Sequence, residues 1–193
     1  MNLIDRVKRI LLSPQPEWEA IDGEATTPSA LYTGYIMPLA AIGPIATVIG
    51  YSVFGIRVPF SATVYRVPIG SAITSAIVTY VLTLVGVYVL SLIIDALAPT
   101  FGGTKSRIQA LKVAVYAATA GWIAGIFSMV PGLRFLGILG LYSLYLLYLG
   151  LPVLMKAPKE KAVSYTVVVI IAAIVLAMIV ATIAGRFMTI PVA

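Results

Sequence analysis

The sequence contains no cysteine and no histidine. Their absence excludes disulfide bonds, thiolate nucleophiles, imidazole bases and the commonest zinc ligands. Acidic residues are also scarce: there are seven in 193 residues, and all but Asp95 and Glu160 lie before residue 25. No pair of carboxylates is placed to converge on an acid–base site within the remaining chain. We therefore predict no enzymatic activity, no metal site and no cofactor.

Apolar residues, by contrast, are abundant. They make up 61% of the chain, charged residues make up only 10%, and the mean hydropathy is +1.05. The apolar residues form blocks long enough, at about 1.5 Å per residue, to cross a hydrocarbon core of roughly 30 Å. A bilayer core offers no water to free backbone groups, so each block must be helical. The sequence thus predicts an all-α polytopic bundle of five transmembrane helices, at residues 31–54, 69–97, 109–130, 135–155 and 163–186.

The positions of the basic residues predict the orientation of these spans. With a cytoplasmic N-terminus, nine of the thirteen basic residues fall on the cytoplasmic side: Arg6, Lys8, Arg9, Lys105, Arg107, Lys112, Lys156, Lys159 and Lys161. The opposite side receives Arg57, Arg66, Arg134 and Arg186. This bias predicts a multi-pass protein of the inner (cytoplasmic) membrane, with its N-terminus in the cytoplasm and its C-terminus on the opposite side. The net charge of +6 then indicates contact with membrane lipids and not with nucleic acid.

Residues 1–30 are predicted to be a cytoplasmic segment that precedes the membrane domain of residues 31–193. They lack the pattern of a cleaved signal peptide, so we expect the mature chain to start near Met1. The stretch MNLIDRVKRILL has the spacing of an amphipathic helix lying in the membrane interface, ended by Pro14 and Pro16. Trp18 is expected to anchor at headgroup level, and EWEAIDGE to be a solvated acidic link. A calcium site there is disfavoured because the twelve-residue loop pattern is missing.

The first span is expected to be kinked or broken. Pro38 and Pro44 each remove one helix hydrogen-bond donor and crowd the preceding turn. Broken helices occur at transport sites, but they are also tolerated as packing features where neighbouring helices satisfy the backbone. Both interpretations stay open for this span.

One ionisable group stands out within the apolar blocks. Asp95 is the only acid in any of them, and such a residue is a candidate functional group by default. Because the apolar run ends three residues later, we also expect Asp95 to lie near the headgroups and to pair with Lys105 or Arg107. Their loop, FGGTKSR, lacks the spacing of a nucleotide-binding loop, although it could bind lipid phosphate. Ser106 and Gln109 fit a capping box for the third span.

Small residues mark a close-packing face on the third span. Gly121 and Gly125, with Ala117, are four residues apart, which suits close helix contact either within the bundle or between protomers of a homo-oligomer. The second span carries a weakly polar stripe at the same spacing, formed by Ser71, Ser75, Thr79 and Thr83.

The fourth span carries a slanting band of tyrosines, Tyr142, Tyr145 and Tyr148. Their hydroxyl groups need hydrogen-bond partners within the membrane, and the stripe of the second span is the expected source. If a water-filled cavity exists among the first, second and fourth spans, these tyrosines are expected to line it. Gly150 and Pro152 are expected to loosen the last turns before Lys156 leaves the bilayer.

Four stretches in combination resemble the prokaryotic branch of the Yip (Ypt-interacting protein) membrane family: RVKRILLSPQPEWEAI, LYTGYIMPLAAIGPIATVIG, APTFGGTKSRIQALKVAVYA and LYLLYLGLPVLMKAPKEKAVSYT. The resemblance covers nearly the whole chain and implies a five-span helical protein with a cytoplasmic N-terminus. Eukaryotic members of that family are associated with Rab-type GTPases and vesicle traffic. One departure is Thr119-Ala120, where the family pattern has a threonine–proline pair that would kink the third span.

Two classes of function follow from these observations. The first is a non-enzymatic membrane protein that organises a membrane-protein partner, a second copy or lipids through helix–helix association. The second is a channel or transporter for ions, small solutes or lipids, favoured by the proline-interrupted first span and the polar stripe. The scarcity of intramembrane charge favours the first.

Overall fold

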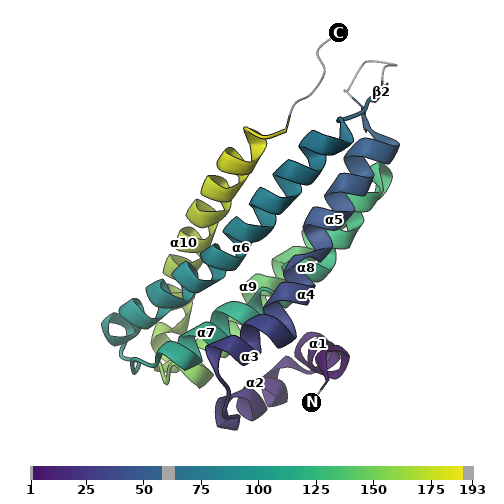
Figure 1. Ribbon diagram of the computed structural model, residues 1–193. Coiled ribbons are helices and arrows are strands. Elements are labelled where there is room, and N and C mark those ends of the chain that lie inside the picture. The colour runs from purple at the N-terminus through teal and green to yellow at the C-terminus, as the bar shows by residue number, and fades with distance from the viewer. Residues whose placement is uncertain (1, 58–63, 189–193) are drawn as a thin grey trace.

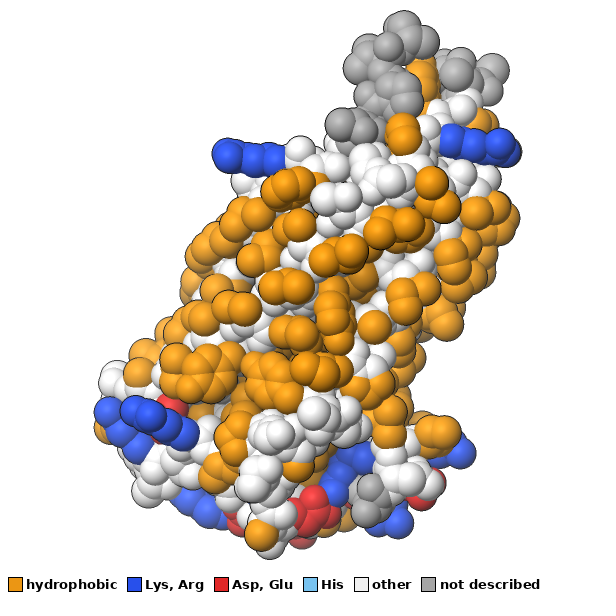
Figure 2. Space-filling model, in the orientation of Figure 1, with side chains coloured by type: hydrophobic (Ala, Val, Ile, Leu, Met, Phe, Trp, Pro, Cys, Tyr) orange, Lys and Arg blue, Asp and Glu red, His pale blue; other side chains and the backbone are white. Residues whose placement is uncertain are grey.

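The computed structural model describes residues 2–57 and 64–188, and most of them are helical. Five helical regions are long and apolar enough to cross a membrane: Pro28–Phe54, Ile69–Phe101, Arg107–Met129, Pro131–Leu154 and Lys159–Gly185. Their ends differ from the predicted ones by at most about four residues, so the predicted five-span helical bundle is confirmed. Apolar side chains cover the sides of the bundle, and basic side chains gather at its two ends (Figure 2).

Two helices precede the first span. α1 spans Leu3–Leu12 and α2 spans Pro14–Gly23, and both lie across one end of the bundle (Figure 1). We call this end, which also holds Lys156, the N-terminal end. α1 ends before Pro14, as predicted, and the chain then turns directly into a second helix. Pro14 starts α2, because the first position of a helix needs no backbone N–H.

The first span is interrupted as predicted. It consists of α3 (Pro28–Leu31), a π-helical turn (Tyr32–Ile36), α4 (Met37–Ala40), α5 (Ile42–Ile49) and a second π-helical turn (Gly50–Phe54). Pro38 follows the first π-helical turn and Pro44 lies in the first turn of α5, where neither can donate a helix hydrogen bond. After this span, β1 (Ile56–Arg57) and β2 (Val64–Tyr65) form a short antiparallel ribbon.

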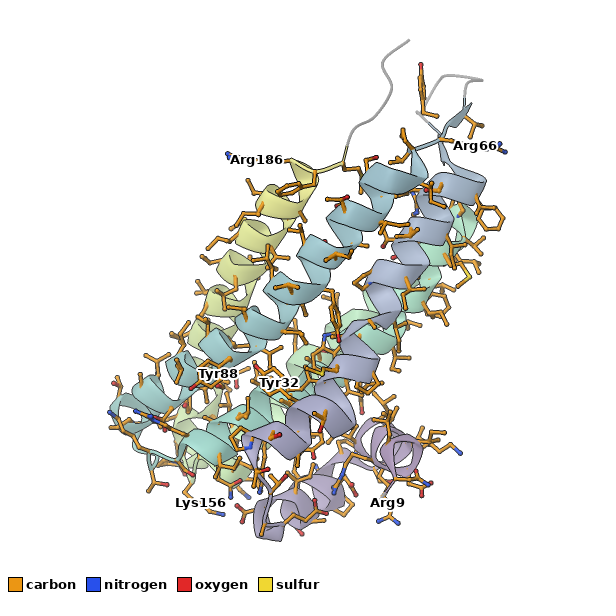
Figure 3. All side chains as sticks on the ribbon, viewed as in Figure 1. Arg9, Tyr32, Arg66, Tyr88, Lys156 and Arg186 are labelled. Carbon is orange, nitrogen blue, oxygen red and sulfur yellow. The ribbon has the colours of Figure 1, made fainter. Side chains whose placement is uncertain are left out.

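The second and fifth spans are the longest regular helices. α6 covers Ile69–Leu97 and ends in a 3₁₀ turn (Ala98–Phe101), while α10 covers Lys159–Gly185. The two pack side by side (Figure 1). The hydroxyl group of Tyr32, labelled in Figure 3, donates to the Leu84 carbonyl at 2.9 Å and so joins the first span to α6.

The third span is the most enclosed. It comprises α7 (Arg107–Ala117), α8 (Thr119–Ala124) and a 3₁₀ segment (Gly125–Met129). The fourth comprises a 3₁₀ segment (Pro131–Leu141) and α9 (Tyr142–Leu154). Although proline is missing after Thr119, the third span is still interrupted at Ala118. The Thr119 hydroxyl group bonds to the Tyr116 carbonyl at 2.8 Å and to the Tyr35 hydroxyl at 2.8 Å.

Candidate functional site

An enclosed ion-pair network holds α1 on α2. The Arg6 guanidinium donates to the Glu17 carboxylate at 2.6 Å and to both carboxylate oxygens of Glu24. Arg6 is only 6% exposed and Glu17 only 4%. Burial alone would lower the pKa of Arg6, but the hydrogen bond to Glu24 and the nearby carboxylates raise it above its usual value, so the group stays charged. The prediction of a solvated acidic link is therefore wrong for Glu17, whereas Glu24 is paired but still exposed.

The third span contributes a buried cation to the same junction. Lys112 is 3% exposed, and its ammonium group donates to the carbonyl oxygens of Ile21 at 2.8 Å and Glu24 at 2.6 Å. Carbonyl groups in the last turn of a helix lack partners within that helix, and a cation suits their partial negative charge. Lys112 thus fastens the end of α2, and its predicted role as an interfacial base facing lipid headgroups is wrong.

Asp22 is held by the third span and by the loop between the fourth and fifth spans. The Gln109 side-chain amide donates to the Asp22 carboxylate at 3.0 Å, and Lys156 forms an ion pair with that carboxylate at 2.6 Å. The expected capping box is therefore wrong. Ser106 does precede the first residue of α7, but its side chain makes no cap hydrogen bond and Gln109 is engaged elsewhere.

Trp18 is enclosed and does not anchor at headgroup level as expected. Its side chain is 0% exposed and meets the Tyr116 ring edge-on at 6.3 Å between centroids. A Cβ at Gly150 would lie 2.7 Å from the indole Cζ2. Glycine at this position of α9 is therefore what lets the indole lie against the fourth span. We call the set Arg6, Glu17, Trp18, Glu24, Lys112 and Tyr116 the N-terminal junction.

Asp95 makes no ion pair with Lys105 or Arg107 in the part of the chain that the structure describes. It lies near the end of α6, partly buried, and its Oδ1 atom is buried with no hydrogen-bond partner among described residues. Lys105 and Arg107 are exposed at the N-terminal end of the bundle. The expected pairing of these residues is wrong.

The glycines of the FGGTKSR loop serve its packing. Gly102 has a φ of +75°, and a Cβ at Gly103 would lie 2.6 Å from the Met155 carbonyl oxygen. The backbone N–H of Thr104 donates to the same carbonyl at 2.8 Å. The loop therefore packs closely against the end of the fourth span.

The tyrosine band does not meet the second span. Tyr142 donates to the Leu11 carbonyl of α1 at 3.1 Å, while Tyr145 and Tyr148 are 44% and 40% exposed. The hydroxyl groups of Thr79 and Thr83 bond within α6. The expected hydrogen bonds between the tyrosine band and the Ser/Thr stripe of the second span are therefore wrong. Residue spacing shows which side chains share a helix face, but not which neighbouring helix that face contacts.

Gly121 and Gly125 are used inside this chain. A Cβ at Gly125 would lie 2.9 Å from the Gly43 Cα atom of the first span. The backbone N–H of Gly121 donates to the Ser143 hydroxyl group of the fourth span at 2.9 Å. Of the two packing partners predicted for this face, the structure describes the one within the bundle.

Three grooves lie beside the second span on the side of the bundle. The first, about 360 Å³, lies between α5 and α6 and is almost wholly apolar. The second, about 370 Å³, lies among α5, α6 and α10 and includes Thr47, Tyr51, Ser75 and Thr79. The third, about 400 Å³, lies among α6, α7 and α10. Pro44 and Ala76 border the first two, and Thr79 and Ala181 border the last two. We call them the lateral grooves.

These features define a multi-pass helical membrane protein with a docked pair of N-terminal helices. In the described residues, no group of three or more acidic side chains is placed to hold a metal ion. The chain belongs to the Yip1 domain family, because the family model described as the Yip1 domain matches residues 8–181. No match was found among curated proteins or among solved structures.

Proposed function

We propose that this protein is a non-enzymatic member of its family that organises membrane proteins or lipids by lateral association within the bilayer. The lateral grooves are the observation that supports this proposal best. They are lined mainly by small and aliphatic side chains, including Ala76 and Ala181, and small residues permit the close approach of a neighbouring helix or acyl chain. A second copy of the chain is one possible occupant.

The charge within the spans also supports association over coupled transport. Within the five spans, the acidic residues are Asp95 and Glu160, and both lie near a helix end. Coupled transporters rely on ionisable groups facing a pathway through the membrane. The lateral grooves lie on the outside of the bundle beside the second span. Exposed aliphatic residues, such as Ile73 and Ile77, border them.

A site-specific crosslink tests this proposal. A photoreactive residue at Ala181, which is exposed and borders two grooves, should give a discrete and reproducible adduct in native membranes, either one protein or one lipid class. The matched control is Val175, which is exposed on the same helix and borders none of the three grooves. The same broad mixture of bulk lipid adducts at both positions would contradict lateral association.

A second candidate function is the passage of a small solute, an ion or a lipid. The groove that contains Thr47, Tyr51 and Ser75 favours it, because these hydroxyl groups give that groove a polar side. Purified protein in liposomes should then move a probe, and Asp95→Asn should alter the flux. A broad panel of solutes and lipid probes that shows no flux would exclude this candidate.

We also propose that the protein resides in the cytoplasmic (inner) membrane with its N-terminus in the cytoplasm. Support comes from the unequal ends of the bundle: Arg9 and Lys156 lie at one end, and Arg66 and Arg186 at the other (Figure 3). Arg6 and Lys112 are both buried, so seven of the nine bases assigned to the cytoplasmic side remain, against four on the other.

A further inference from the structure

A separate cavity lies at the N-terminal end, between α2 and the two last spans. Its volume is about 460 Å³, within the usual range of ligand sites, and both polar and apolar side chains line it. The lining comprises Gln15, Trp18 and Glu19 of α2, Tyr148, Leu149, Pro152 and Val153 of α9, and Lys159 and Ala162 of α10. None of these residues borders the lateral grooves.

Two opposite charges at this cavity are free to meet a ligand. Glu19 and Lys159 are both exposed, and neither belongs to an ion pair in the described parts of the chain. Lys159 is also the first residue of α10, where unpaired backbone N–H groups and the helix dipole favour an anion. The cavity therefore offers an acceptor for a cation and a donor set for an anion.

The cavity also has an unsatisfied buried donor in its wall. The Trp18 indole lines the cavity, and its Nε1–H is buried with no hydrogen-bond partner among the described residues. Because Trp18 is 0% exposed, this donor is not open to a ligand, and the indole contributes to the cavity as part of its wall. Pro152 lines the cavity from α9. It cannot donate the usual helix hydrogen bond, so the Tyr148 carbonyl lacks that donor.

The apolar part of the lining comes from the fourth span. Leu149, Pro152 and Val153 are partly exposed on α9 within the apolar run, while Lys159 follows the loop at the end of the bundle. The cavity thus passes from a charged rim to an apolar wall over the end of a membrane span. A ligand that fits this gradient has a charged head and acyl chains.

We propose that this cavity binds one glycerophospholipid whose headgroup carries both a phosphate and a primary ammonium group, as phosphatidylethanolamine does. The phosphate accepts hydrogen bonds from Lys159 and the α10 N-terminus, and the ammonium group donates to Glu19 and the Gln15 side-chain carbonyl. The acyl chains lie along α9, beside the Trp18 indole in the cavity wall. A purely anionic headgroup would leave Glu19 unpaired, and a trimethylammonium headgroup cannot donate to it.

This site deepens the proposed function by naming a lipid class, and it rests on that function only in that lipids are among the proposed partners. Its test is independent of the crosslink at Ala181. If quenching of Trp18 shows no lipid selectivity, the proposal of lateral association is unaffected. If a photoreactive residue at Ala181 gives no discrete adduct, the proposed lipid site is unaffected.

Quenching of Trp18 fluorescence by brominated lipids tests the site. The chain has two tryptophans, so Trp122→Phe leaves Trp18 as the sole reporter. The full chain is reconstituted in phosphatidylcholine vesicles to which brominated phosphatidylethanolamine, phosphatidylglycerol or phosphatidylcholine is added. Phosphatidylethanolamine should quench at a lower lipid fraction than the other two. Equal quenching by the three lipids would overturn the proposal.

Matched variants locate the effect. Lys159→Gln and Glu19→Gln should each raise the phosphatidylethanolamine fraction needed for half-quenching about tenfold, because each removes a charge-assisted hydrogen bond. Lys105→Gln and Asp5→Asn change exposed charges outside the lining and away from the start of α10, and should leave it unchanged. Equal effects of both pairs of variants would overturn the site as assigned.

Soluble glycerophosphoethanolamine distinguishes a membrane lipid from a free solute. It carries the headgroup without acyl chains and so lacks the part that contacts α9. It should not displace the brominated lipid at an equal headgroup concentration. Displacement as effective as that by the intact lipid would overturn the assignment to a lipid.

Discussion

The Arg6 guanidinium lies 2.6 Å from the Glu17 carboxylate, and both side chains are almost completely buried. Buried ion pairs contribute little net stability when both partners are present, but removing one leaves an uncompensated buried charge. Arg6→Gln is therefore expected to lower the free energy of unfolding in mild detergent by about 3 kcal/mol. The measurement is denaturation followed by circular dichroism and by Trp18 fluorescence.

The control for that change is Arg9→Gln, on the exposed face of the same helix. An exposed charge without a close partner should alter the free energy of unfolding by no more than about 0.5 kcal/mol. Equal losses from both variants would contradict the assignment of Arg6 to an enclosed network.

Gly43 and Gly125 face each other across the first and third spans, but their tolerance of a methyl group should differ. A Cβ at Gly125 would lie 2.9 Å from the Gly43 Cα, whereas a Cβ at Gly43 would lie 3.9 Å from the Gly125 Cα. Gly125→Ala should therefore cost about 1–3 kcal/mol through overpacking, and Gly43→Ala should be nearly neutral. Thermal unfolding of the two variants in one detergent provides the comparison, and the reverse order would contradict this packing.

Gly150 makes the other close approach, to an aromatic ring. In Gly150→Ala, the added Cβ would lie 2.7 Å from Trp18 Cζ2 and 2.9 Å from Cε2, so either the ring or α2 must move. We expect a loss of about 1–3 kcal/mol in unfolding free energy. Gly86→Ala is the control, since nothing lies within 4 Å of its added Cβ. A loss in the control as large as that of Gly150→Ala would argue against the close contact.

The proposed orientation can be measured directly because the chain has no cysteine of its own. Single cysteines at Lys8 and Arg186, both exposed, report on the two ends of the bundle. A membrane-impermeant maleimide should label the cysteine at 186 in intact cells and the one at 8 only after lysis. A cysteine at Val175 should stay unlabelled in both. Labelling at position 8 in intact cells would reverse the orientation.

The spans were predictable because their signal is local and repeated. About twenty apolar residues in a row have few alternatives to a membrane helix, and Pro38 and Pro44 act on the backbone wherever they occur. The break near Thr119 was not predictable from proline alone, because a side-chain hydrogen bond from Thr119 to Tyr116 accompanies it.

The N-terminal junction was mispredicted because its partners are distant in the sequence. Arg6 and Glu17 are 11 residues apart, and Lys112 reaches Ile21 across 91. Each residue alone looks like a solvated charge or an interfacial base. One sequence feature could have drawn attention to Lys112: it lies several residues inside an apolar span, where an ionisable group needs a partner.

The fluorescence of Trp18 tests most directly whether the N-terminal helices are a built-in part of the bundle. In the Trp122→Phe variant, Trp18 is the sole emitter and its side chain is 0% exposed. Aqueous acrylamide should therefore quench it weakly, and Gly150→Ala or Arg6→Gln should increase the quenching. Quenching as strong as that of free tryptophan before any further substitution would contradict the docking of α2 on the third and fourth spans.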